Sequence, residues 1–139
     1  MKIRTFDIED QAAVIELWQA CALVVAWNDP TKDIARKLKV GADLFLVGES
    51  SGEIVATVMG GYEGHRGWIN YLAVSPQHQR KGYGRKMMHA VEQRIQLKGC
   101  PKINLQVRGT NTQAAAFYRS IGYDIENVIG LGKRLEPDI

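Results

Sequence analysis

The sequence has few cysteines and no long apolar run. Cys21 and Cys100 are its two cysteines, and they occur in neither a CxxC motif nor a metal-ligand spacing. This spacing argues against a disulfide framework, and two free thiols are typical of a reducing compartment. No apolar run approaches the roughly 18 residues of a membrane span, and the first ten residues are charged early. We therefore expect a cytoplasmic protein with no membrane partner.

The sequence also lacks a strong overall charge. The formal net charge is +3, which is small for a protein that binds nucleic acid through many phosphates. Four basic residues nevertheless fall within seven positions: Arg80, Lys81, Arg85 and Lys86. Tyr83 is the one stacking aromatic residue among them, so we expect no nucleic-acid partner. His78 and His89 flank this stretch without a partner at metal spacing, and we expect no metal site.

Length and periodicity predict one α/β (α+β) domain. A chain of 139 residues with 45% hydrophobic and 24% charged residues can bury a core. Helical spacing indicates four helices, near 8–21, 30–38, 84–98 and 112–121. Alternating or apolar runs predict strands at 2–6, 43–49, 53–62, 68–74, 102–107 and 128–136. Together these elements predict a mixed sheet with helices on both faces.

The segment between strand 68–74 and helix 84–98 predicts an anion-binding turn. It reads Gln79-Arg80-Lys81-Gly82-Tyr83-Gly84. A helix N-terminus presents free N–H groups and the positive end of a dipole. Gly82 and Gly84 allow a close backbone approach, and the basic side chains add full charges. The sequence therefore favours a phosphate or diphosphate ligand.

Two common phosphate motifs do not fit this turn. A Walker A loop needs Gly-Lys-Ser/Thr, whereas Gly84 is followed by Arg85, Lys86 and Met87. A dinucleotide fingerprint needs a third glycine, where Met87 stands, and an acidic residue about 20 positions on. No acidic residue occurs between Glu92 and Asp124. We exclude both readings.

Two patterns together resemble the GNAT superfamily of acyl-CoA-dependent N-acetyltransferases, in its compact single-domain bacterial form. Residues 79–84 match Q/R-x-x-G-x-G/A, the acyl-CoA motif of that family. The pattern N-x-x-A-x-x-F-Y-x-x-x-G-Y then follows the next predicted strand, as Asn111, Ala114, Phe117, Tyr118, Gly122 and Tyr123. The order of elements matches along essentially the whole chain, so residues 1–139 are interpreted as a single N-acetyltransferase domain.

The resemblance implies a fold and a cosubstrate. The GNAT fold would give a mostly antiparallel sheet of six to seven strands flanked by about four helices, splayed between strands 68–74 and 102–107. Acetyl-CoA would bind in that opening, with its pantetheine along Leu72–Val74 and its diphosphate on the backbone near 80–85. The cofactor-binding residues so implied are Leu72, Ala73, Val74, Gln79, Arg80, Lys81, Gly82, Tyr83, Gly84, Arg85, Asn111 and Tyr118.

The resemblance also implies a reaction. A neutral primary amine would attack the thioester directly in a ternary complex, so the site must remove one proton and return another to the thiolate. Tyr118 matches the family's catalytic tyrosine and is predicted to be the general acid. Trp68 stands where some members carry a glutamate base. Glu63 is therefore the predicted base, with His65, Tyr71 or water as alternatives.

The acceptor is less constrained than the cosubstrate. A small amine is favoured because the chain is short, and a protein N-terminus or lysine is the alternative. Trp68 at the base position also keeps open a catalytically inactive CoA-binding module. The sequence leaves the oligomeric state open, with a homodimer among the alternatives.

Overall fold

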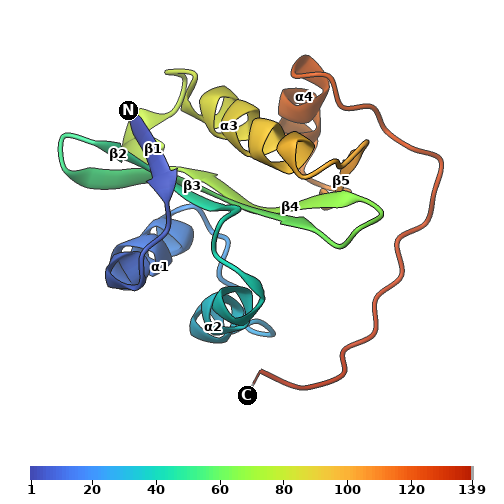
Figure 1. Ribbon diagram of the computed structural model, residues 1–139, viewed down its shortest axis with the longest axis horizontal. Coiled ribbons are helices and arrows are strands. Elements are labelled where there is room, and N and C mark those ends of the chain that lie inside the picture. The colour runs from blue at the N-terminus through green and yellow to red at the C-terminus, as the bar shows by residue number, and fades with distance from the viewer. Residues whose placement is uncertain (139) are drawn as a thin grey trace.

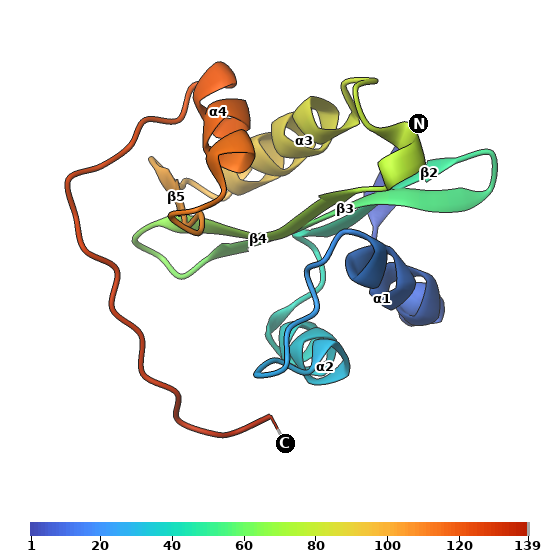
Figure 2. The ribbon, with the colours of Figure 1, turned by 180° about the vertical axis from the view of Figure 1, so that it is seen from behind.

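The computed structural model describes residues 1–138 as one sheet with helices packed on both of its faces (Figures 1 and 2). The strands are β1 (Lys2–Thr5), β2 (Phe45–Ser50), β3 (Glu53–Tyr62), β4 (Gly67–Val74) and β5 (Ile103–Leu105). The helices are α1 (Gln11–Ala20), α2 (Pro30–Val40), α3 (Tyr83–Leu97) and α4 (Thr112–Ser120), with short 3-10 turns at Ile8–Asp10 and Pro76–His78. None of the helices within 1–138 has the length and apolarity to span a membrane.

The sheet opens between its last two strands. Its order is β1-β2-β3-β4-β5, and every neighbouring pair is antiparallel except β4 and β5, which are parallel. That parallel pairing covers only Gly67–Ile69 against Ile103–Leu105. The rest of β4, residues 70–74, has no β5 partner. The predicted splay between these two strands is therefore confirmed.

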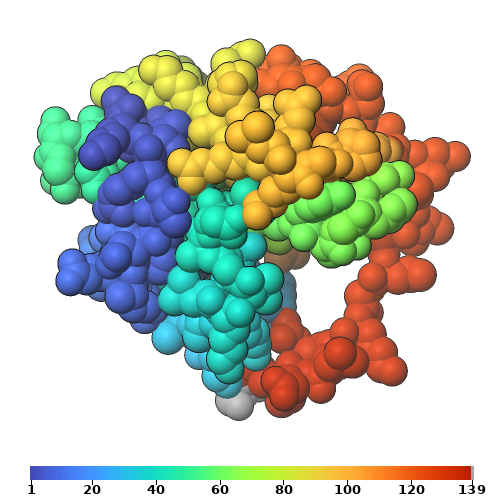
Figure 3. Space-filling model, viewed as in Figure 1, coloured from blue at the N-terminus to red at the C-terminus, as the bar shows by residue number. Residues whose placement is uncertain are grey.

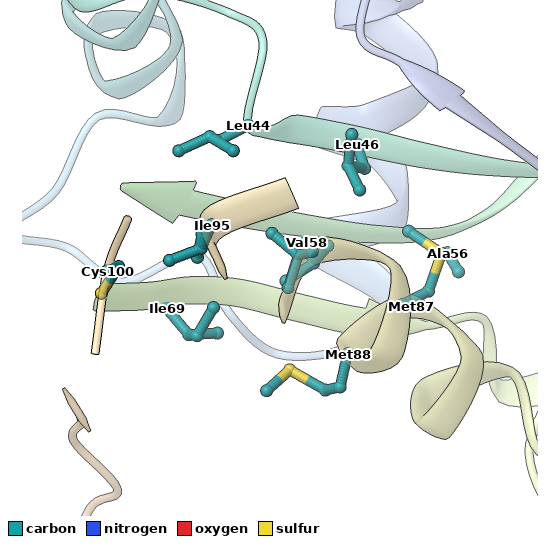
Figure 4. Close-up of a cluster of buried hydrophobic side chains, with 10 residues drawn as sticks. Leu44, Leu46, Ala56, Val58, Ile69, Met87, Met88, Ile95 and Cys100 are labelled. Carbon is teal, nitrogen blue, oxygen red and sulfur yellow. The ribbon is translucent and has the colours of Figure 1, made fainter. Parts of the chain in front are cut away.

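Two apolar clusters hold the helices to the sheet. Under α3, Met87, Met88, Val91 and Ile95 pack on sheet residues such as Val58 (Figure 4). These four residues form one face of α3, and all are buried. On the opposite face, α1 and α2 cover a second cluster that includes Trp18 and Phe45. Both faces of the sheet are thus buried, which explains why β2 and β3 are apolar along most of their length.

The N-terminus of α2 is capped by the residue that precedes it. Asp29 accepts hydrogen bonds from the backbone N–H groups of Thr31 (2.9 Å) and Lys32 (3.4 Å), and Pro30 occupies the first helical position. An Asp cap before Pro satisfies a helix end whose first N–H groups have no internal acceptor. An Asp-Pro pair is accordingly a typical start of a helix.

The main correction to the sequence prediction concerns the strand expected at 128–136. The sheet has five strands within residues 1–138, not six to seven, because 128–136 forms no strand. Instead, the chain after α4 arches away from the sheet and returns to α2 (Figures 1 and 3). Asp138 accepts hydrogen bonds from Arg36 (2.9 Å) and from the Asp29 N–H (2.7 Å), and these contacts hold the far end there. Gly130 and Gly132 further weaken the strand pattern.

Candidate functional site

The turn before α3 has an unusual backbone. Arg80 has φ +64° and Gly82 has φ +80°, both in the left-handed region. A non-glycine residue is uncommon there, and left-handed residues in short turns help to direct several N–H groups toward one side. Gly82 is the N-cap of α3, and a Cβ at Gly82 would meet nothing within 4 Å. A glycine is thus required at position 82 because of the backbone conformation, and not because a side chain would lack space.

The first N–H groups of α3 are left without protein acceptors. Gly82 provides no side-chain cap, and the helix ladder begins with the Lys86 N–H, which donates to the Gly82 carbonyl at 3.1 Å. Within residues 1–138, no acceptor is recorded for the N–H groups of Tyr83, Gly84 or Arg85. The side chains of Arg80, Lys81 and Arg85 are exposed around them. Free N–H groups with three exposed cations fit a diphosphate.

Gly84 brings the two sequence motifs into contact. A Cβ at Gly84 would lie 3.3 Å from the Phe117 ring and 3.7 Å from a Val74 methyl carbon. The absence of a side chain therefore lets the first turn of α3 approach both α4 and β4. Because Phe117 precedes Tyr118, this contact fixes the predicted acid relative to the anion-binding turn.

A β-bulge shapes the free part of β4. Ala73 lies opposite Thr57 and Asn70 lies opposite Met59, so β4 has one extra residue in this stretch. Tyr71 has φ +52° at the bulge. The buried Thr57 hydroxyl donates to the Tyr71 carbonyl (2.8 Å) and accepts from the Trp18 indole N–H (2.9 Å). These bonds hold the bulge in place.

The residues that follow the bulge, 72–74, are the predicted pantetheine contacts, and their side chains alternate between the two faces of the sheet. Leu72 and Val74 pack against the cluster under α3, while Ala73 belongs to the cluster under α1 and α2. Their backbone lies along the stretch of β4 that β5 leaves unpaired. The Val74 carbonyl accepts hydrogen bonds from the Cys21 thiol and from the Gln79 amide, each at 3.3 Å. Gln79 therefore also helps to fix its own turn.

Asn111 serves as the N-cap of α4. Its Oδ1 accepts a hydrogen bond from the Ala114 N–H at 3.0 Å. Its amide nitrogen has no recorded acceptor within the part of the chain that the structure describes, and the residue is exposed. Asn111 thus caps α4, and the donor that a ligand carbonyl requires is still available.

Tyr118 is half-buried between two aromatic neighbours. Its ring lies edge-on to Phe117 and to Tyr123, with centroids 5.2 and 5.8 Å away. The Tyr123 hydroxyl donates to Glu92 at 2.6 Å, so its ring is fixed. Burial raises the pKa of Tyr118 to about 12. A phenol in this environment retains its proton at neutral pH and can donate it.

Tyr118 lines an open hollow between β4, β5, α4 and the C-terminal segment. This β4–β5 hollow has a volume of about 1280 Å³. Asn70 of β4 and Asn104 of β5 also line it. Sequence reasoning missed both asparagines, although Asn70 is a polar break in the apolar run of strand 68–74. These polar side chains and the predicted acid thus line the same hollow.

The candidate bases lie apart from one another. Glu63 is exposed in the turn between β3 and β4, where its Oε1 accepts from the N–H of His65 (3.0 Å) and of Arg66. Tyr71 points to the other face of the sheet, stacks on Trp18 with ring centroids 3.7 Å apart, and donates to Asp33 at 2.5 Å. Burial and the Asp33 carboxylate raise the pKa of Tyr71. Glu63, His65 and Tyr71 are absent from the residues that line the hollow.

Comparison with known proteins agrees with this geometry. The model of the acetyltransferase (GNAT) family matches residues 12–123. Acetyltransferase SG1711 of Sodalis glossinidius is 45% identical over 139 residues, covering 99% of this chain and 98% of that protein.

Two solved structures share the fold. An aminoglycoside 6'-N-acetyltransferase from Acinetobacter haemolyticus superposes with a TM-score of 0.75 at 17% identity, covering 98% of this chain and 100% of that one. The PaiA N-acetyltransferase of Thermoplasma acidophilum, solved with coenzyme A, gives 0.73 at 20% identity, with 93% and 92% covered. With the family match over most of its length, the chain belongs to the GNAT family of acetyltransferases.

Proposed function

We propose that this protein transfers the acetyl group of acetyl-CoA to a primary amine. One observation carries the proposal: the Gly84–Phe117 contact joins a turn with free N–H groups to a half-buried tyrosine beside an unpaired stretch of β4. An anion site, an open strand edge and a proton donor then lie along one path. A bound acetyl-CoA would supply the thioester carbonyl, and the chain itself supplies the groups described next.

The binding residues follow the sequence prediction. The N–H groups of residues 83–85 would receive the diphosphate, with Arg80, Lys81 and Arg85 contributing charge. The backbone of residues 72–74 that has no β5 partner, apart from the Val74 carbonyl that Cys21 and Gln79 engage, would pair with the amides of the pantetheine arm as an added strand does. The Asn111 amide would donate to the same arm. The PaiA protein, which has the same fold and was solved with coenzyme A, supports coenzyme A as the ligand.

Two protein groups would move protons. Tyr118, whose pKa burial raises to about 12, would hold its proton at neutral pH and donate it to the thiolate as that group leaves. Because Glu63 does not line the β4–β5 hollow, it would accept the amine proton through water, at the Oε2 that the turn leaves without a recorded partner within residues 1–138. The amide of a glutamine at position 63 would preserve the turn contacts and lose the base.

A small amine is the proposed acceptor. The β4–β5 hollow offers the polar side chains of Asn70 and Asn104 near Tyr118. The Acinetobacter haemolyticus protein, whose name specifies an aminoglycoside 6'-amine, has the same fold. A broad free-amine acceptor set is therefore the first to assay.

The test is a CoA-release assay with acetyl-CoA against a panel of small amines and of peptides with free N-termini or lysines. Release with at least one small amine, together with acetylated product by mass spectrometry, is the expected result. Turnover with peptides alone would overturn the small-amine acceptor. Saturable CoA binding without turnover on any amine would overturn the enzyme and leave a CoA-binding module.

A further inference from the structure

Arg108 lines the β4–β5 hollow and lies over the ring of Trp27. Its guanidinium carbon is 5.4 Å from the centroid of that ring, and Trp27 is 54% exposed. Arg108 follows β5, whereas Trp27 lies in the loop between α1 and α2. A guanidinium is attracted to the face of an indole. The contact therefore holds Arg108 in place and joins two segments that are distant in the sequence.

The contact with Trp27 leaves the hydrogen-bond donors of Arg108 available. A cation–π attraction depends on the positive charge and needs no hydrogen-bond acceptor. Within residues 1–138, no hydrogen bond or ion pair of the Arg108 side chain is recorded, whereas Arg36 and Arg134 both pair with Asp138. A guanidinium has five N–H donors in a fixed fork, which fits two oxygens of a carboxylate or a phosphate.

The loop that carries Trp27 adds a second donor to the hollow. Asn28 lines the hollow, and its Oδ1 accepts a hydrogen bond from Arg134 at 2.7 Å. Because Arg134 can only donate, this bond assigns the oxygen of the amide and leaves its NH2 group directed elsewhere. That NH2 group has no recorded acceptor in the part of the chain that the structure describes. A charged fork and a neutral amide thus come from adjoining segments.

The pairing of the charges along the hollow also favours an anion. The lining has three cationic and three acidic residues, so the total charge does not decide the matter. Lys102 forms an ion pair with Glu126, and Glu92 accepts from the Tyr123 hydroxyl at 2.6 Å. The charged residues of the lining without a recorded side-chain partner in residues 1–138 are Arg108, Arg119 and Asp124. Two of these three are cationic, and an acceptor with several ammonium groups would approach both.

We propose that the acceptor carries an anionic oxygen group, a carboxylate or a phosphate, beside its amine, and that Arg108 binds this group with the Asn28 amide. The inference rests on the proposed acetyl transfer and narrows its acceptor to one class of small amine. Tyr118 lines the same hollow, so an acceptor anchored at Arg108 would present its amine on the side of the proton donor.

Matched acceptors test the inference in a CoA-release assay with acetyl-CoA. Amino acids are compared with their own carboxamides, and phosphoethanolamine with ethanolamine. At least one charged acceptor should exceed its neutral partner about tenfold or more in kcat/KM, and the two kinds of pair distinguish a carboxylate from a phosphate. The amine of a carboxamide loses its proton more readily than that of the amino acid, so amine basicity does not produce this preference. Equal or reversed values in every pair, or spermidine as the best acceptor, would overturn the inference.

Arg108→Gln tests the residue itself. The variant should raise KM for the preferred charged acceptor about 30-fold and leave kcat nearly unchanged, because it removes binding that ground state and transition state share. Arg108→Lys keeps the charge without the fork and should recover only part of the loss. The matched control is Lys39→Gln, at an exposed residue of α2 outside the lining of the hollow, which should behave as the wild type.

An intact cosubstrate site is checked in the same variants. The dissociation constant of CoA, measured by calorimetry, should be unchanged in Arg108→Gln, which shows that the protein is folded. A preference for the charged acceptor that survives Arg108→Gln would overturn Arg108 as the residue that binds the anion.

The indole N–H of Trp27 gives a readout that does not require turnover. In a 15N-labelled sample with CoA, the charged acceptors should shift this resonance, and their neutral partners should not. The indole N–H of Trp18, which donates to Thr57 at 2.9 Å in the core, is the internal control. A Trp27 shift without acetyl transfer to any amine would overturn the proposed function and support the anion site. Acetyl transfer without charge preference and without this shift would overturn the anion site alone.

Discussion

The turns at the two ends of β4 use their backbone N–H groups in opposite ways (Figure 1). At the hairpin end, the Glu63 carboxylate accepts from the N–H groups of His65 and Arg66. At the α3 end, the N-cap is Gly82, which has no side chain, and the N–H groups that follow have no recorded acceptor in residues 1–138. One turn satisfies its own N–H groups, and the other leaves N–H groups that we propose bind an external anion.

This difference indicates which of the two turns is expected to bind a ligand. Both turns contain a left-handed glycine, Gly64 (φ +102°) and Gly82 (φ +80°), so unusual conformation does not distinguish them. Both are also exposed and carry basic residues. The turns differ in their hydrogen bonding. At the α3 end, backbone N–H groups without acceptors in the described chain lie beside exposed cationic side chains, whereas at the hairpin end the N–H groups are already bound by the Glu63 carboxylate. Four predictions test this difference and the site that it indicates.

Tyr118→Phe should have the largest effect. If the free N–H groups position acetyl-CoA beside Tyr118, loss of the phenol proton should lower kcat about 1000-fold, within the range for general acid catalysis. The dissociation constant of CoA should change less than threefold. Steady-state kinetics and calorimetry measure the two quantities, and Tyr62→Phe, whose hydroxyl donates to the Gly64 carbonyl, is the matched control. Unchanged kcat would remove Tyr118 from the mechanism.

Glu63→Gln should lower kcat about 100-fold at neutral pH. The amide oxygen still accepts from His65 and Arg66, so the melting temperature should stay within about 2 °C of the wild type. Glu63→Ala provides the comparison, because it loses both the base and the turn contacts. Full activity in the glutamine variant would leave Glu63 as a turn residue and direct attention to His65, Tyr71 or water.

Gly82→Ala should weaken CoA binding about tenfold. A Cβ in the left-handed region costs about 1 kcal/mol, and relief of that strain would turn the N–H groups of the turn away from the ligand. Gly64→Ala is the control at the other end of β4, since a Cβ there also meets nothing within 4 Å. It should lose similar stability in urea unfolding while binding CoA normally. Equal loss of binding in both variants would contradict the contrast.

A smaller effect is expected from alkaline pH. The folded pKa of Tyr118 is raised to about 12 from the ordinary value of 10. Below pH 10 the phenol is neutral in both states, so it does not alter stability. Between pH 10 and 12 it ionises first in the unfolded chain, so stability falls there, by about 1 kcal/mol once solvent screening is allowed for. Urea unfolding should show a shallower loss in Tyr118→Phe, and identical slopes would contradict the assigned burial.

Local chemistry explains how much of this molecule could be predicted from its sequence. The Asp29 cap and the buried face of α3 follow from spacing and short-range signals, whereas the splay of β4 from β5 was implied by the GNAT resemblance; the structure shows all three. The two motifs could be predicted to act together, but their physical link through Gly84 and Phe117 depends on tertiary packing.

The remaining features arise from contacts between distant residues. The bulge at Tyr71 is held by Thr57 and Trp18, far away in the sequence. The strand predicted at 128–136 was wrong because Asp138 and Arg134 bind groups on the α2 side, about 100 residues earlier. Periodicity describes one segment at a time, so it contains no information on these partners.

Amide chemical shifts provide the most direct measurement of the central claim. In a 15N-labelled sample titrated with CoA, the N–H groups of residues 80–85 should shift most, and those of residues 63–66 should stay nearly unchanged. Pantetheine, which lacks the diphosphate, should leave residues 80–85 unperturbed. Saturable CoA binding that shifts other residues and not 80–85 would contradict the assignment of this turn as the diphosphate site.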